Sequence, residues 1–114
     1  MSALLNVGLH VNGRPALSSL QVLRALRWIG VEPLRGAIHE SDTEPTFVVE
    51  VDRPLHQAAL DALANALQQE AVAQWSDGHG RLAGPKAALW GPFDPAFFLT
   101  LDGKRLENRA LAAA

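Results

Sequence analysis

Residues 36–52, GAIHESDTEPTFVVEVD, decide the fold, because they predict two strands joined by a polar turn. In the second half, Phe47, Val49 and Val51 fall on every second position, the period of a strand that packs mainly on one side. The residues before the turn alternate in the same way. Between the two halves, 41–45 combines serine, aspartate, threonine, glutamate and proline, which favour a turn at the surface. The stretch therefore predicts a β-hairpin.

A helix pattern flanks this hairpin on each side. The first helix is predicted over 18–29, where a serine can cap its start and Gly30 follows its end. Trp28 falls at the edge of its apolar face, and we expect it in the core or at the core boundary. The second helix is predicted to open at 52–54, where an aspartate or a neighbour caps it, and to run to about residue 68.

A strand pattern lies beyond each helix, at 4–11 and at 71–76. The order strand, helix, strand, strand, helix, strand predicts an α+β, ferredoxin-like βαββαβ two-layer sandwich, with two helices on one face of an antiparallel sheet. At this length we expect a single domain, 1–114. Its core would be 1–76, and 77–114 would add a hairpin and an irregular aromatic extension.

The aromatic extension is the least regular part of the sequence. Five of the seven aromatic residues lie from Trp75 onward, and Pro92 and Pro95 interrupt any continuous helix or strand. We expect a short strand at 97–101 and a helical or frayed end. The extension either covers the open face of the sheet or supplies anchors for a protein partner. The predicted partner-binding residues are Trp90, Phe93, Phe97 and Phe98.

Two helices on one face leave the other face of the sheet bare, so the extension or a second subunit must cover it. We therefore expect a homodimer.

Composition narrows the classes of function. The chain has 114 residues, 48% of them hydrophobic, with a net charge of −2 and no cysteine. We expect a cytoplasmic protein without a membrane contact, because no signal peptide and no apolar run of about 20 residues is present. The absence of cysteine excludes disulfides, thiolate nucleophiles and cysteine-ligated metals. Nucleic acid is a disfavoured partner, because such domains are usually strongly basic.

Residues 12–68 resemble an ACT-type regulatory domain. Those domains often read Asp-Arg-Pro-Gly-Xaa-Leu after the first strand, followed by a helix ending in Gly-Val or Gly-Ile, a hairpin and a second helix. The matching stretches here are Gly-Arg-Pro-Ala-Leu at 13–17 and Ile-Gly-Val at 29–31. Ala16 stands where the family has a ligand-contacting glycine, and its methyl group would hinder a close backbone approach. The resemblance implies a non-catalytic sensing module that pairs through its sheet or its helices.

The best small-molecule site in the sequence is the turn before the first helix. The free amides of that helix could hold an anion with help from Arg14. The alternative is an ordinary capped turn. The predicted ligand-binding residues are Asn12, Gly13, Arg14 and Leu17.

No catalytic residue, metal ligand or cofactor is assigned. We expect a non-enzymatic binding or regulatory module that recognises a small molecule or a protein partner. One alternative is a small inhibitor or adaptor that binds through the aromatic extension. Another is a small enzyme or metal-binding protein that uses the turn from His39 to Glu44. Adjacent turn residues such as His39, Ser41 and Asp42 point apart, however, whereas catalytic sets usually combine separate elements.

Overall fold

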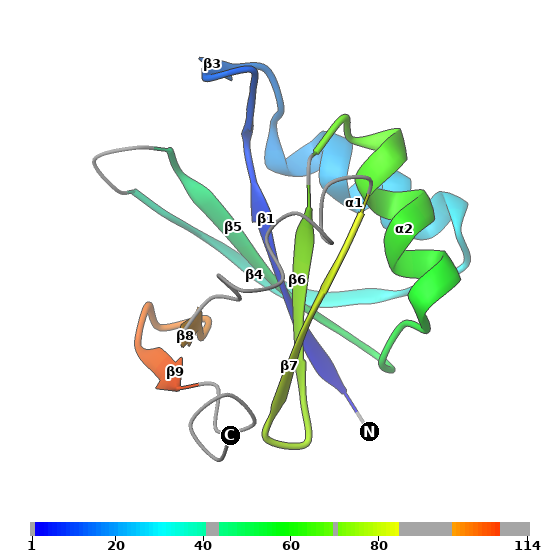
Figure 1. Cartoon of the computed structure of the whole chain (residues 1–114), viewed down its shortest axis with the longest axis vertical. Helices are drawn as coiled ribbons and strands as arrows, with labels where there is room; N and C mark the ends of the chain where they lie inside the picture. Colours follow the sequence, from blue (N-terminus) through cyan, green and yellow to red (C-terminus); the bar gives the residue numbers. More distant parts are fainter. Residues whose placement is uncertain (1, 41–43, 70, 85–96, 108–114) are drawn as a thin grey trace.

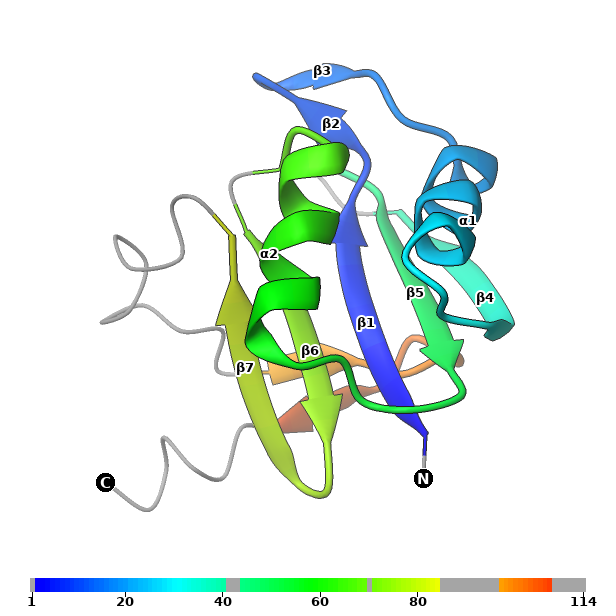
Figure 2. The ribbon, with the colours of Figure 1, turned by 90° about the vertical axis from the view of Figure 1, so that its right-hand side faces the viewer.

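The computed structural model describes residues 2–40, 44–69, 71–84 and 97–107. It shows two helices packed on one face of a five-stranded antiparallel sheet, with the strand order β4-β5-β1-β6-β7 (Figures 1 and 2). This confirms the predicted α+β sandwich with βαββαβ order. The elements are β1 Ala3–Gly8, β2 His10–Val11, β3 Arg14–Pro15, α1 Ser19–Trp28, β4 Pro33–His39, β5 Thr46–Val51, α2 Gln57–Ala66, β6 Val72–Ser76, β7 His79–Ala83, β8 Phe97–Leu99 and β9 Arg105–Glu107.

The predicted hairpin forms β4 and β5, and β1 lies in the middle of the sheet. Leu5 of β1 stands opposite Val49 of β5 on one side and Gln74 of β6 on the other. These residues face the helices, and the alternate residues of each strand face the opposite side of the sheet, here called the far face. Alternation along each strand therefore decides what enters the core.

The first predicted strand divides at Leu9. β1 ends at Gly8, and β2 forms a separate two-stranded ribbon with β3. At Leu9 the pairing changes, because its carbonyl oxygen accepts from the N–H groups of Ala16 and Leu17. A turn joins β2 to β3, where Asn12 has φ 53° and Gly13 has φ 75°. Two residues with positive φ make a tight hairpin turn, a geometry that asparagine followed by glycine favours.

Each helix is capped by a side chain that bonds a backbone N–H three residues further on, but only the cap of α1 lies where the sequence predicted it. Ser18 caps α1 through a capping box with Gln21, in which each side chain accepts from the other residue's backbone N–H. The cap of α2 is His56, whose Nδ1 accepts from the backbone N–H of Ala59. Helix α2 thus begins later than the predicted opening at 52–54, because the Asp52 N–H donates to the carbonyl oxygen of Glu32 and so continues the pairing of β5 with the start of β4.

The hydrophobic core lies between the sheet and the helices. Val22 and Leu26 are the fully buried residues of α1, and Leu60, Leu63 and Ala64 are those of α2. Trp28 is 89% exposed, so the prediction that it belongs to the core or its boundary is wrong. It is the last residue of α1, and on the helical wheel it lies well away from the direction of Val22 and Leu26.

The β8–β9 hairpin lies against the far face, on the side of the sheet opposite the two helices (Figures 1 and 2). β8 confirms the strand expected within 97–101. β9 corrects the expectation of a helical or frayed end for its residues, because 105–107 pair with β8. In the part of the chain that the structure describes, no helix has the length and apolar character needed to cross a bilayer.

Candidate functional site

Two polar side chains of the sheet attach the β8–β9 hairpin. The Asn6 Nδ2 donates to the carbonyl oxygen of Leu99 at 3.2 Å, and the Leu99 N–H donates to Asn6 Oδ1 at 2.9 Å. Nε2 of His39 lies 3.0 Å from the carbonyl oxygen of Leu101. Because a carbonyl can only accept, this contact assigns the ring proton to Nε2. The side chain of Asn6 thus bonds to the backbone of Leu99 through one donor and one acceptor, as the backbone of a neighbouring strand would.

An aromatic contact completes the attachment. The Phe98 ring is buried, and its centroid lies 5.3 Å from that of Trp75 with the planes tilted by 49°. This distance and tilt are typical of a favourable aromatic pair. The hairpin is therefore held by polar bonds on the β1 and β4 side and by apolar packing on the β6 side.

We expect Asn6→Asp to loosen the hairpin by about 1–3 kcal/mol, because a carboxylate cannot donate to the carbonyl of Leu99. Hydrogen exchange should become faster for the amides of 97–107 and stay slow in β5. The same change at exposed Asn12, Asn12→Asp, is the matched control and should leave exchange unchanged. Unaltered protection of the hairpin in Asn6→Asp would contradict this role for Asn6.

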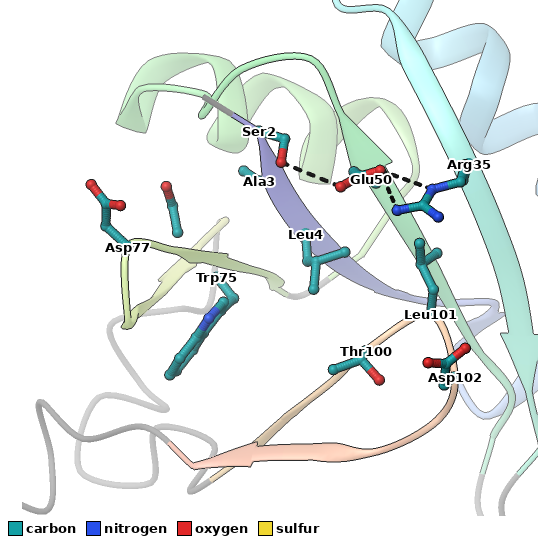
Figure 3. Close-up of a pocket in the computed structure, with 11 residues that line it drawn as sticks. Ser2, Ala3, Leu4, Arg35, Glu50, Trp75, Asp77, Thr100, Leu101 and Asp102 are labelled. Atoms are coloured by element: carbon teal, nitrogen blue, oxygen red, sulfur yellow. Dashed lines mark hydrogen bonds and ion pairs between the residues drawn. The ribbon is translucent and has the colours of Figure 1, made fainter.

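A pocket of about 350 Å³ lies between the far face and the hairpin (Figure 3). Its lining comes from the start of β1, the β4 strand, the end of β5, the end of β6 with the residue after it, and the turn after β8. The lining residues are Ser2, Ala3, Leu4, Arg35, Glu50, Trp75, Ser76, Asp77, Thr100, Leu101 and Asp102. The Trp75 ring and the segment from Thr100 to Asp102 lie on two sides of this space, with Leu4 between them (Figure 3).

An ion pair forms the polar end of the pocket. Arg35 and Glu50 stand opposite each other in the β4–β5 register, and both Nε and Nη2 of Arg35 lie 3.0 Å from Glu50 Oε1. Ser2 Oγ donates to the other carboxylate oxygen, Oε2, at 3.3 Å. The Arg35 side chain is 69% exposed and the Glu50 side chain 20% exposed. The pair is thus partly open to solvent and orients Glu50 more than it stabilises the fold.

The pocket has an excess of negative charge. Glu50, Asp77 and Asp102 supply three carboxylates, against the single guanidinium of Arg35. Asp77 and Asp102 are exposed, and within the described ranges neither has a hydrogen-bonded or ion-pair partner. Two carboxylates are thus available to a ligand.

The residues predicted to bind a ligand do not gather into one site. Asn12, Gly13 and Arg14 are exposed at the tip of the β2–β3 ribbon, whereas Leu17 packs against the core. The β3 strand and residues 16–18 separate this tip from α1. The capping box of Ser18 already uses an amide of the first helical turn. The geometry here is that of a capped helix preceded by a hairpin turn.

The predicted partner-binding aromatics divide between described and undescribed residues. Trp90 and Phe93 lie outside the described residues, and Phe97 belongs to β8. Phe98 is 1% exposed, so its ring contributes to packing within the chain.

The two ends of the turn from His39 to Glu44 contact different parts of the fold. His39 contacts the β8–β9 hairpin, as described above, while Glu44 Oε2 accepts from the backbone N–H of His10 at 2.9 Å. The predicted Ser41 and Asp42 lie outside the described residues. Across the described ranges, no three side chains of the metal-ligating types gather where they could hold an ion.

No sequence pattern marks the pocket residues as a set. Arg35 and Glu50 are fifteen residues apart and meet only through the register of β4 and β5. Alternation could have placed them on the same face, but it could not show that the segment from Thr100 to Asp102 would lie opposite. That placement depends on long-range bonds such as the one from Asn6 to Leu99.

Comparison of the chain with family models, with curated proteins and with solved structures gave no match. The structure shows a βαββαβ order of elements, and no family model confirms the resemblance to ACT-type domains. This order concerns the fold, and a fold alone does not assign a ligand.

Proposed function

We propose that this chain is a non-enzymatic binding module, and that its small-molecule site is the pocket under the β8–β9 hairpin. The observation that carries the proposal is a concave space with an aromatic wall and three carboxylates against one guanidinium. Its volume falls within the range of small-ligand sites. A small organic cation fits this combination of charge and aromatic surface.

The recognition would combine two kinds of contact. The face of the Trp75 ring attracts a cation, and Asp77 and Asp102 accept hydrogen bonds from an ammonium group. At exposed sites each such contact contributes about 0.5–1 kcal/mol, because solvent screens the charges. Three or four of them, with some apolar burial, correspond to a Kd on the order of 1 mM for a small probe.

The proposal is tested by NMR titration of the ¹⁵N-labelled chain with benzylamine, which joins an aromatic ring to an ammonium group. We expect shifts at the Trp75 indole N–H and at the amides of Thr100 and Leu101. Benzyl alcohol has the same ring without the charge, and it should bind at least about fivefold more weakly, a difference near 1 kcal/mol.

Matched variants locate the contact. Asp102→Asn removes one pocket charge and should weaken benzylamine binding about three- to fivefold. Glu32→Gln removes an exposed charge that does not line the pocket, and it should change nothing. Equal binding of amine and alcohol, or shifts confined to residues outside the pocket, would show that this is not a cation site.

A further inference from the structure

The large exposed hydrophobic side chains of the described residues all lie on two adjacent elements. Leu20 and Trp28 belong to α1, and Leu34 and Ile38 belong to β4; each is about half exposed or more. Helix α1 packs beside β4 at one edge of the sheet (Figure 2). Apolar side chains gathered at one edge are typical of an interaction surface.

Strand β4 is also an unpaired edge. It has β5 on one side and no strand on the other within the described part of the chain. Proteins usually protect such edges with short strands, proline or charge, because the free backbone groups can pair with another strand. β4 has seven residues, and its proline and its register shift lie only at its start. Residues 35–39 are regular and available for pairing.

The strand is self-complementary about Gly36. Ile38 lies two residues after it and faces the helix side, as Gly36 does, because their partners Phe47 and Val49 both belong to the core. Leu34 lies two residues before it, at the register shift between Pro33 and Arg35, and is 52% exposed. The Phe47 ring takes the space of the missing side chain, since a Cβ on Gly36 would lie 2.6 Å from it. If two copies of β4 pair antiparallel with Gly36 opposite Gly36, each Leu34 stands directly opposite an Ile38 of the other copy.

The charges agree with this arrangement. Arg24 and Arg27 are exposed on α1, and Glu40, which is also exposed, directly follows the last residue of β4. Within the described residues none of the three has an ion-pair partner. Helix α1 runs antiparallel to β4, so its last turn lies over the start of the strand. In the antiparallel pair, Glu40 of each copy reaches that end of the other copy, near Arg27.

We infer that the occupant of this edge is a second copy of the chain, joined through β4 into a continuous sheet of ten strands. The expected homodimer thus uses the β4 edge. The far face, whose need for cover suggested a dimer from the sequence, carries the β8–β9 hairpin. The interface is independent of the pocket proposal, because it rests on different side chains.

Disulfide trapping tests the register, since the chain has no cysteine of its own. Directly opposed residues in an antiparallel pair have Cα atoms about 4.5–5.5 Å apart, which suits a disulfide. A mixture of Leu34→Cys chains and Ile38→Cys chains should form a mixed disulfide dimer under mild oxidation. Each variant alone should form little, because like positions lie roughly 13 Å apart across the symmetric pair.

Sedimentation of the unmodified chain should give twice the 12.3 kDa monomer mass at high concentration. Ile38→Lys places a charge on the edge and should weaken the dimer about tenfold or more, with an unchanged circular dichroism spectrum because Ile38 is 47% exposed. A monomer at all concentrations, or a dimer that neither responds to Ile38→Lys nor gives the mixed disulfide, would overturn the inference. Benzylamine titration of Ile38→Lys tests ligand binding in the pocket independently of the dimer, because Ile38 does not line the pocket.

Discussion

We expect Phe98→Ala to lower the free energy of unfolding by about 3–5 kcal/mol, the range for a large aromatic removed from a core. Phe98 is among the largest fully buried side chains, yet it lies on the far face and outside the main cluster between sheet and helices. A two-stranded hairpin has little stability of its own in water. Without this ring, β8–β9 should lose its hold on Trp75 and the pocket should lose one wall.

Urea unfolding followed by far-ultraviolet circular dichroism measures the effect of Phe98→Ala. Phe98→Leu keeps most of the apolar volume and should lose about half as much stability. Leu20→Ala, at a position 50% exposed, is the surface control and should change stability by about 0.5 kcal/mol or less. A loss below about 1 kcal/mol in Phe98→Ala would mean that the hairpin contributes little to folding.

Gln74→Leu should destabilise the protein by about 2–4 kcal/mol although it replaces a polar side chain with an apolar one. Gln74 is 4% exposed on β6, on the helix side of the sheet. Its Oε1 accepts from the Leu55 N–H at 2.8 Å, and its Nε2 donates to the Leu55 carbonyl oxygen at 3.0 Å. Leucine would leave both buried backbone groups of Leu55 without a partner, which costs more than the gain from burying a methyl group.

The measurement for Gln74→Leu is again the urea midpoint, with hydrogen exchange of the Leu55 amide as the local readout. The same substitution at exposed Gln57, Gln57→Leu, is the control for a general gain in hydrophobicity and should be nearly neutral. If Gln74→Leu proved as stable as the unmodified chain, the paired amide would not be what holds the segment before α2 to the sheet.

Local patterns predicted most of the fold. The period of two over 46–51 and the serine cap before α1 depend on neighbours within a few residues, so the sequence alone could place β5 and the start of α1. The start of α2 was harder to predict, because aspartate, proline and histidine all lie where a cap could form. The exposure of Trp28 was missed because an apolar residue near a helix end suggests burial, whereas the actual direction depends on how the helix sits on the sheet.

The sequence by itself determined the order of elements, the faces of the strands and the aromatic character of the C-terminal segment. The pocket was decided only by the tertiary structure. Its two sides come from the sheet and from a hairpin whose attachment joins Asn6 to Leu99, 93 residues away. Periodicity tells which face a side chain occupies, but it carries no information about which distant segment covers that face. Which segment bonds to Asn6 is decided only when the whole chain has folded around its core.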